Sequence, residues 1–528
     1  MRNRTICILA IVILWFSWVA FPRPPRVIKP VNPNDPTNLP DQVTKNVLVI
    51  GGGLAGLSAA LELSERGFNV SIKEADTVVG GRLHTKDVKL LNQTWPIETG
   101  FHAWFNNYFQ SHDILERLGV KSNFRRWEAV DYIFRDYEPE SIYSKGPYPL
   151  NLFGLIHRSP NMKLTDALHS VKSLVDLAYF QYDTIFEKYA NTTLEEWARD
   201  KDVPQSFYDI LMKPILSVTL NRRDIFSAAE MLTYNQIYFL SDSSADHRII
   251  TTKNFQDAVI GPWTQLLLSY GVRIQLNTKV EQLVMNNDGS KFISTSSTPN
   301  EQFDHVIMAA SLDSIQNILK STEKQYHDNE QIRNKINCLL RKVGKLPMSP
   351  PYKVMRVWFD KQLQNKPEIL ETPHHHPINL IVQYNLLEET YAEWANRTGG
   401  SVLEFHLYTW SYGDVSDDRV WDLIRPTAEE IYPDIKDFKI LAYHVHSAND
   451  FPSFEINTHQ FRPTVTYPKE CELPNLSFAG DWLYTDFPSA LMERAVTTGR
   501  QAANHVLLSE GVRQSNIVSI NLDGPGIV

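Results

Sequence analysis

The stretch Asn46-Val-Leu-Val-Ile50-Gly51-Gly52-Gly53-Leu54-Ala55-Gly56 decides the fold. Four apolar residues follow Asn46 without a charge, as in a buried parallel strand, and run directly into the glycines. Helical spacing begins at once, with Leu57, Leu61 and Ser64 on one stripe and Gly67 at the expected end. This order of strand, glycine turn and helix is typical of a dinucleotide-binding domain.

Each glycine of the turn has its own expected role. Gly51 permits the tight turn, Gly53 lets the backbone approach a pyrophosphate, and Gly56 lets helix and strand pack closely. The exposed amides at Leu54 and Ala55, at the positive end of the helix, would then receive the phosphates.

The next motifs favour FAD over NAD. A second apolar strand, Asn69–Lys73, ends at Glu74, which is placed to accept hydrogen bonds from an adenosine ribose and disfavours the 2′-phosphate of NADP. A second glycine turn with a fixed cation, Gly80-Gly81-Arg82, follows closely and suits a longer cofactor whose diphosphate needs extra neutralisation. No further glycine-rich dinucleotide motif is visible, so reduction by NAD(P)H is not expected.

A strand again runs into glycine near the other end of the chain, at Leu476-Ser-Phe-Ala-Gly480-Asp481. A helix is expected from Ser489 to about Leu508. Asp481 is placed to bind a ribityl hydroxyl, and the positive amino end of this helix would stabilise the reduced, anionic flavin.

At these residues the chain resembles the flavin amine oxidase and phytoene desaturase superfamily. The matching stretches are GGGLAGLSAALELSERGFNVSIKEA (51–75), GGR (80–82), ETGFHAWF (98–105), LSFAGDW (476–482) and SALMERAVTTGRQAAN (489–504). Within the superfamily it looks most like the carotenoid desaturases of the isorenieratene synthase type. The resemblance implies noncovalent FAD, since Cys471 does not stand in a context like the family's covalent attachment sites.

The resemblance also implies individual site residues. Gly100, Phe101 and His102 would lie beside the isoalloxazine, and His102 would touch flavin or substrate. Val280 would follow the strand that contacts adenine, and Met492 would join the cofactor site. Amine oxidases of the superfamily carry a lysine at the start of a strand beneath the flavin, so the similar Lys353-Val-Met-Arg-Val-Trp implies a catalytic Lys353 near N5.

The expected fold is a two-lobed α/β oxidoreductase, with a discontinuous Rossmann-like FAD domain and an interleaved α+β substrate domain. The expected segments are 1–21 as membrane anchor or signal, 22–43 as proline-rich stalk, 44–103, 250–310 and 471–510 as FAD domain, 104–249 and 311–470 as substrate domain, and 511–528 as tail.

The amino terminus predicts attachment to a membrane. An apolar run from Ile6 to Phe21 is interrupted only by Ser17, and we favour an uncleaved anchor over a cleaved signal, placing the protein on a membrane of the secretory pathway. Seven prolines between Pro22 and Pro40 predict an extended stalk. The sequence does not settle which side of the membrane the folded part faces, and sequons occur at Asn92, Asn191, Asn396 and Asn475.

Composition excludes several functions. A net charge of −9 without a basic run argues against nucleic acid. With Cys7 in the leader, the three cysteines allow at most one bridge. No carboxylate or cysteine accompanies His374-His375-His376 at ligand spacing, so we expect a solvated loop and no metal.

Three functions remain open from the sequence. The first is desaturation or dehydrogenation of an apolar, carotenoid-like isoprenoid, with dioxygen or a membrane quinone reoxidising the flavin. The second is oxidation of an amine by dioxygen, which Lys353 favours. The third is a membrane-tethered flavoprotein without catalysis.

Overall fold

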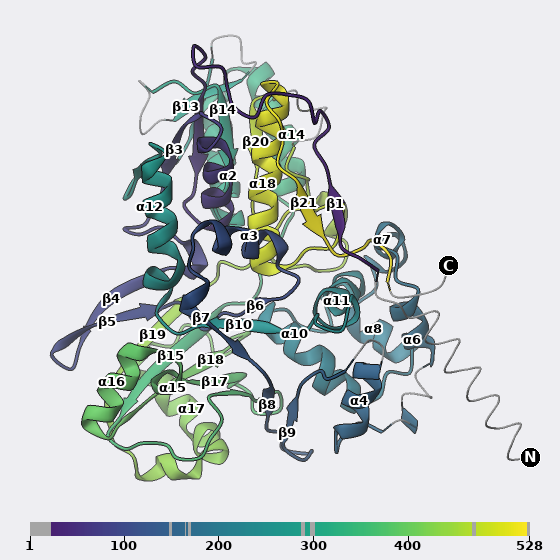
Figure 1. The fold of residues 1–528 in the computed structure, drawn as a ribbon, viewed down its shortest axis with the longest axis vertical. Helices are drawn as coiled ribbons and strands as arrows, with labels where there is room; N and C mark the ends of the chain where they lie inside the picture. Colours follow the sequence, from purple (N-terminus) through teal and green to yellow (C-terminus); the bar gives the residue numbers. More distant parts are fainter. Residues whose placement is uncertain are drawn as a thin grey trace, which may run out of the picture.

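A five-stranded parallel sheet forms the centre of one lobe of the computed structural model (Figure 1). Its strand order is β11-β3-β2-β14-β20, and every neighbouring pair runs parallel. The strands, in that order, are Arg273–Gln275, Asn69–Lys73, Asn46–Ile50, His305–Met308 and Leu476–Phe478. The two strands predicted around the glycine turn, β2 and β3, are confirmed with their predicted bounds.

The structure describes residues 23–146, 150–163, 165–166, 171–286, 291–295, 301–466, 471 and 473–524. The expected anchor at 1–21 lies outside them. Within these ranges, no helix has both the length and the apolar character needed to cross a bilayer.

Helices cover both faces of the parallel sheet because successive side chains of a strand point to opposite sides. Val47 and Val49 of β2 pack in one core with helices on one face, while Leu48 and Ile50 pack in another core with helices on the opposite face. The first face carries α2 (Leu54–Ser64), α12 (Gly261–Ser269) and α18 (Leu491–Ser509). The second carries α13 (Leu312–Gln325) and α14 (Glu330–Val343).

The position of α13 and α14 corrects one expected boundary. Ile315 and Leu319 of α13 and Leu339 of α14 are completely buried in the same core as Leu48. These helices therefore belong to the cofactor lobe, and the second inserted segment begins after Val343 rather than at residue 311. The apolar side chains of these two helices pack against the face of the parallel sheet that α2 and α18 do not cover.

The second lobe is built on a seven-stranded sheet of order β19-β15-β18-β17-β16-β8-β9. Its strands, in that order, are Ile440–Ala448, Tyr352–Phe359, Ser401–Leu407, Leu380–Gln383, Ile369–Glu371, Val130–Tyr132 and Glu140–Ile142. Only the β16–β8 pair runs parallel among these described strands. Helix α17 (Asp417–Ile431) packs on one face, while α16 (Glu389–Thr398) and the hairpin β4–β5 (Thr85–Leu90, Gln93–Glu98) pack on the other.

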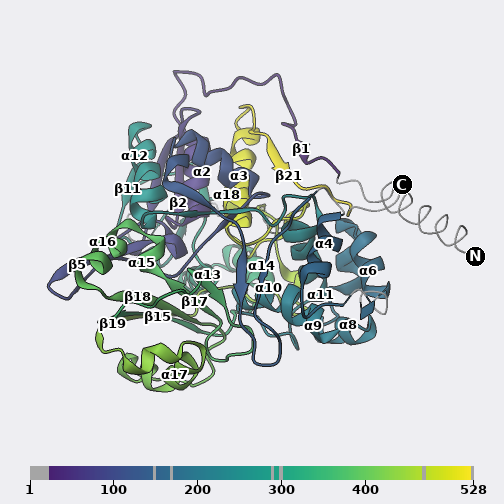
Figure 2. The same ribbon diagram turned by 60° about the horizontal axis from the view of Figure 1, so that its bottom comes forward.

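A group of helices stands beside this sheet, as Figures 1 and 2 both show. Its members are α4 (Leu150–Arg158), α6 (Val171–Ala178), α7 (Tyr182–Tyr189), α8 (Leu194–Asp200), α10 (Lys213–Val218) and α11 (Ala228–Asn235). A three-stranded sheet, β6-β10-β7 (Trp104–Phe105, Arg248–Thr251, Phe124–Trp127), lies between the lobes. The predicted two-lobed α/β fold is confirmed.

The segment expected to be a free stalk is instead docked on the folded body. Strand β1 (Arg26–Ile28) pairs antiparallel with β21 (Ile517–Ser519), which lies in the expected tail. The backbone amide of Leu39 donates to the Arg66 carbonyl at 2.9 Å, and the Leu39 side chain is buried. The stalk prediction is wrong because proline prevents helix formation but does not prevent strand pairing at the residues between prolines.

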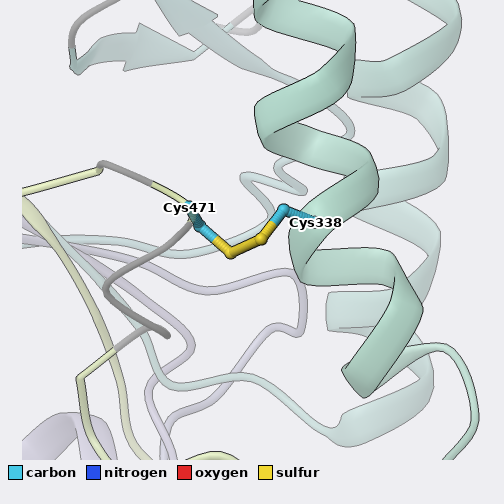
Figure 3. Close-up of a disulfide and its surroundings, with 2 residues drawn as sticks. All are labelled: Cys338 and Cys471. Carbon is cyan, nitrogen blue, oxygen red and sulfur yellow. A yellow bond between two sulfur atoms is a disulfide. The ribbon is translucent and has the colours of Figure 1, made fainter.

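A disulfide joins Cys338 of α14 to Cys471, shortly before β20 (Figure 3). The cysteines are 133 residues apart in sequence, so this one bridge spans the whole second inserted segment. It is consistent with the expectation of at most one bridge. Both cysteines are buried in the cofactor lobe.

Candidate active site

The glycine turn after β2 has the geometry that its sequence predicts. Gly51 has φ +105°, and a β-carbon there would lie 2.7 Å from the Ala309 carbonyl oxygen. A β-carbon at Gly56 would lie 2.0 Å from the Gly51 oxygen, so only glycine lets α2 approach the strand this closely. At Gly53 the nearest atom would be the Gly81 Cα at 3.7 Å, which leaves the space above the turn open.

The second glycine turn stacks directly on the first. The Gly80 amide donates to the Gly52 carbonyl at 2.8 Å, and Gly81, with φ +56°, would place a β-carbon 3.0 Å from the Gly53 Cα. The approach to Gly53 explains the glycine at 81, and the positive φ of +117° explains the glycine at 80.

A cavity of about 1100 Å³ starts at these turns and extends between the lobes. It brings together nearly all of the predicted site residues. Those that line it are Gly51, Gly53, Leu54, Ala55, Glu74, Gly81, Arg82, Gly100, Phe101, His102, Val280, Gly480, Asp481 and Met492. Gly56 lies outside the lining, as expected of a residue that serves packing.

The residues at the turn fit a bound dinucleotide. No side chain in the described part of the chain caps the amino end of α2, so its first amides are available to phosphate oxygens. The Glu74 carboxylate lines the cavity and is held in place by the amides of Gly52 at 2.6 Å and Asp76 at 2.8 Å. Together with the open backbone at Gly53, this donor and acceptor set fits the FAD that the sequence predicts.

Arg82 and Asp481, for which the sequence suggested separate contacts, form an ion pair. Their Nη2 and Oδ2 atoms are 2.7 Å apart, and the guanidinium lies over the Phe451 ring at 4.1 Å. Burial alone would lower the pKa of Arg82, but the nearby carboxylates of Asp481 and Asp450 raise it. The arginine is therefore a fixed cation whose charge is already partly compensated.

His102 lies in the cavity wall as an uncharged imidazole. Burial lowers its pKa to about 4, and its Nδ1 must carry the proton because it hydrogen-bonds the Gly100 carbonyl at 2.9 Å. Its ring packs edge-on to Phe255 at 5.4 Å. The contact with flavin or substrate expected from the resemblance stays a prediction.

Lys353 is not at the site, which corrects the catalytic role predicted for it. It lies on β15, where its neighbours Tyr352 and Val354 face the cavity, and side chains alternate along a strand. Its Nζ instead donates to Ser447 Oγ at 2.6 Å and lies 3.4 Å from Asp417 Oδ1. The lysine is buried on the opposite face of the sheet.

The histidine loop, which was expected to be solvated, is exposed at His376 but not at the two histidines before it. His374 Nε2 lies 3.2 Å from Asp209 Oδ2, and His375 is only 3% exposed. Within the described residues, no cluster of three or more His, Cys, Asp and Glu side chains is arranged to hold a metal ion.

A buried chain of polar residues leads from the sheet to the cavity and was missed at the sequence level. Glu404 Oε2 accepts hydrogen bonds from the Nε and Nη2 atoms of Arg356 at 2.8 and 2.6 Å. Glu404 Oε1 lies 2.8 Å from His406 Nε2, and His406 Nδ1 lies 3.0 Å from the Tyr408 hydroxyl. His406 and Tyr408 line the cavity. The available signal was the polar pair Glu404 and His406, two residues apart in the otherwise apolar stretch 402–407.

A second polar group lies in the cavity wall around Glu371. Burial raises the pKa of this carboxyl to about 8, and the Arg248 guanidinium opposes this rise. Arg248 stacks over the Trp127 ring at 4.3 Å, and within the described residues its Nε and Nη2 have no hydrogen-bond partner. Both side chains line the cavity.

The chain is similar in sequence to a known protein family and to several of its members. The sequence pattern of the family described as flavin containing amine oxidoreductase matches residues 54–507. A carotenoid phi-ring synthase of Chlorobaculum tepidum is 24% identical, covering 91% of each chain. A 15-cis-phytoene desaturase of Arabidopsis thaliana is also 24% identical, covering 87% of this chain and 80% of the relative.

A solved structure shows the same fold. The putative protoporphyrinogen oxidase from Exiguobacterium sp. 255-15 superposes with a TM-score of 0.59 at 14% identity, covering 88% of this chain and 99% of the other. At this identity the likeness concerns the fold alone.

Proposed function

This chain belongs to the flavin-containing amine oxidoreductase family and is an FAD-dependent oxidoreductase, and from that premise we propose that it desaturates an apolar, carotenoid-like isoprenoid. The observation that carries the proposal is the apolar extension of the cavity beyond the cofactor end. That part is lined by Ile142, Ile215, Val218, Leu220, Phe239 and Leu380. The names of the carotenoid phi-ring synthase and phytoene desaturase relatives support the same substrate class.

We assign the cofactor contacts to the predicted lining residues. The turn at Gly51–Gly53 and the first amides of α2 would hold the diphosphate, Glu74 the adenosine ribose, and Gly100, Gly480 and Met492 the flavin end. Bound oxidised FAD supplies a hydride acceptor. Noncovalent binding is supported by the pairing of Cys338 with Cys471, which leaves neither thiol free for attachment.

The structure places the residue that favoured amine oxidation away from the cavity. Lys353 was the sequence feature that pointed to an oxidase, and it lies on the far face of β15. An amine also needs a site that tolerates a cation, whereas the deeper cavity is mainly aliphatic and aromatic.

The test is anaerobic reduction of the purified holoenzyme. We expect a cyclic-ended polyene of the carotene class, delivered in detergent, to bleach the flavin, and a panel of primary amines to leave it oxidised. Bleaching by an amine instead would select the oxidase. Bleaching by neither class would favour a protein without catalysis. Reoxidation by dioxygen and by a lipid quinone, compared in the same cuvette, identifies the electron acceptor.

We also propose that residues 1–21 anchor the enzyme in a membrane of the secretory pathway, with the folded body on the oxidising side. The disulfide supports this side, because disulfides persist in oxidising compartments. Glycosidase treatment tests it. Asn92, Asn191 and Asn396 are exposed sequons, whereas Asn475 is buried and donates to the Asp304 carbonyl at 3.0 Å. Glycan at any of the first three supports the assignment, and a full-length chain with reactive thiols and no glycan contradicts it.

A further inference from the structure

We propose that the Tyr408 hydroxyl accepts the proton that substrate dehydrogenation releases and passes its own proton to His406, with Glu404 and Arg356 holding the imidazole in the receptive tautomer. The inference rests on the proposed desaturase function and adds the residues that manage the proton. Desaturation removes two hydrogens, of which the flavin takes only one as hydride, so a proton acceptor is required at the cavity.

The tautomer of His406 follows from its neighbours. Burial alone would raise the pKa of Glu404, but the Arg356 guanidinium and then His406 lower it to about 2, so Glu404 is an anion that can only accept. His406 Nε2, 2.8 Å away, must therefore donate to it. The Nδ1 atom is left with a lone pair and accepts from the Tyr408 hydroxyl at 3.0 Å.

Arg356 fixes Glu404 in position from the other side. It is 1% exposed, and its guanidinium lies 3.4 Å from the centroid of the Tyr384 ring and hydrogen-bonds the Tyr391 hydroxyl. Its Nη2 also lies 3.0 Å from Glu98 Oε2. A carboxylate held this rigidly orients the imidazole in the way a carboxylate orients the histidine of a hydrolase triad. Glu404 and Arg356 are positioning residues.

The hydrogen-bonded series from Arg356 to Tyr408 reaches the place where the flavin is expected. A β-carbon at Gly100 would lie 3.1 Å from His406 Cε1, and Gly100 is among the residues assigned to the flavin end. Tyr408 lines the same cavity, and its hydroxyl lies 3.0 Å from His406 Nδ1. The phenol is therefore one hydrogen bond away from a residue that packs against the expected flavin end, in a cavity that the apolar side chains assigned to the substrate also line.

Two other titratable groups of the cavity are less suited to accept this proton. His102 is a weak base, because burial lowers its pKa to about 4. Glu371 already holds a proton at neutral pH, because burial raises its pKa to about 8. The phenol of Tyr408 does not need to ionise at rest, since it can gain and lose a proton in one concerted step.

The step balances in atoms and electrons. One substrate C–H bond breaks and its electron pair leaves as hydride to oxidised FAD. The adjacent carbon loses a proton to the Tyr408 oxygen, while the original hydroxyl proton moves to His406 Nδ1, and the electron pair left behind forms the new C=C bond. The resulting imidazolium is paired with the Glu404 carboxylate.

The kinetic test compares Tyr408→Phe with the parent holoenzyme in anaerobic single-turnover reduction by the polyene. We expect the rate of flavin reduction to fall by roughly 100-fold or more, the usual size of a general-base contribution, with flavin affinity and polyene Kd unchanged. The rate of flavin reduction in His406→Gln should fall by a comparable factor. Tyr443→Phe, an exposed tyrosine on β19 of the same sheet, is the matched control and should react as the parent does. An unchanged reduction rate in Tyr408→Phe overturns the relay while leaving the desaturase function intact.

The second measurement does not depend on activity. In apoprotein with 15N-labelled histidine, the His406 signals are identified by their loss in His406→Gln. We expect Nδ1 to be unprotonated and to shift in Tyr408→Phe, where its hydrogen bond is lost. A proton on Nδ1 in the parent contradicts the relay. If no polyene reduces the parent enzyme, the proposed function fails, and this tautomer then decides the hydrogen-bonded chain by itself.

Discussion

At the scale of single residues, the glycines of the cofactor site divide by what a β-carbon would meet. At Gly56 it would collide with backbone at 2.0 Å, a contact that no side-chain motion relieves. At Gly53, where φ is −75°, it would meet only the Gly81 Cα at an ordinary 3.7 Å. One glycine is therefore required by the fold and the other by whatever occupies the space above the turn.

Replacing each of these glycines by alanine should separate the two roles. Gly53→Ala should leave the thermal unfolding of the apoprotein unchanged but weaken FAD binding at least tenfold, or about 1.4 kcal/mol. Gly56→Ala should lower the free energy of unfolding by about 1–3 kcal/mol even without flavin, because the backbone cannot yield without shifting α2. Calorimetry of the apoproteins and flavin titration check both. Normal flavin affinity in Gly53→Ala would show that the diphosphate does not lie against this turn.

Glu371 predicts a pH dependence with a definite sign. Its pKa is raised by burial from 4.5 to about 8, so between these values the folded protein keeps a proton that the unfolded chain has released. The group therefore costs stability increasingly as pH rises through this window and costs nothing below it. As the pH rises through that range, the free energy of unfolding of Glu371→Gln should increase relative to that of the parent by up to about 1.4 kcal/mol per pH unit. Denaturant unfolding of both proteins at about pH 5 and about pH 8 measures the gain, and an equal difference at both pH values would contradict it.

The residue-level predictions succeeded where backbone geometry determines the amino acid. The glycines at positive φ, such as Gly51 and Gly81, are imposed by local structure, so a single sequence reveals them, whereas the ribose contact expected of Glu74 stays a prediction. The catalytic role predicted for Lys353 was wrong because the direction of a strand side chain depends on which face of β15 meets the cavity. The spacing of Glu404, His406 and Tyr408 is local, but the contact of Glu404 with Arg356 joins β18 to β15, and no local pattern encodes that pairing.

At the scale of elements, the crossing of α18 over α2 holds the cofactor lobe together. A β-carbon at Gly499 would lie 2.2 Å from the Ala55 carbonyl oxygen and 2.9 Å from Ser58 Cβ. The helices therefore touch backbone to backbone at this point. The first turn of α18 then delivers Leu491, Met492 and Ala495 to the cavity.

Gly499→Ala should move α18 and so disturb a site two turns away. We expect a loss of about 1–3 kcal/mol in unfolding free energy, together with weaker FAD binding, because the cavity-lining end of α18 shifts with the helix. Ser509→Ala, at the exposed far end of the same helix, is the control and should change neither quantity. Flavin affinity that stays normal while stability falls would show that the helix pivots without moving its amino end.

Element prediction from the sequence was accurate where patterns are periodic and local. The strands β2 and β3 and the helix α18 were located from apolar runs and glycines. The assignment of α13 and α14 to a lobe was wrong because an amphipathic stripe shows that a helix packs against something and does not show against which sheet. The partner is set by the path of the chain after β14.

At the scale of the whole molecule, the two ends of the described chain are bound to each other. Besides the β1–β21 pairing, Arg23 forms an ion pair with Asp523 at 2.8 Å, and the Val31 amide donates to Gln514 Oε1 at 2.8 Å. The sequence could not show this, since the pairing joins residues almost 500 positions apart. The distance between the proposed membrane anchor and the catalytic body is therefore much shorter than a free proline stalk would allow.

Two truncations separate anchoring from folding. Deleting residues 1–22 should release the protein from the membrane fraction with its thermal unfolding and FAD content unchanged, because β1 is retained. Deleting residues 1–31 should also release it but lower the free energy of unfolding by about 1–3 kcal/mol, since β21 loses the partner for its backbone hydrogen bonds. Carbonate extraction of membranes followed by calorimetry of the soluble fractions makes both measurements. If the 1–22 deletion remained with the membranes, the body itself would have to bind lipid. If the 1–31 deletion melted with the parent, β1 would be a passive tether, and the docking of this segment would contribute nothing to the stability of the fold.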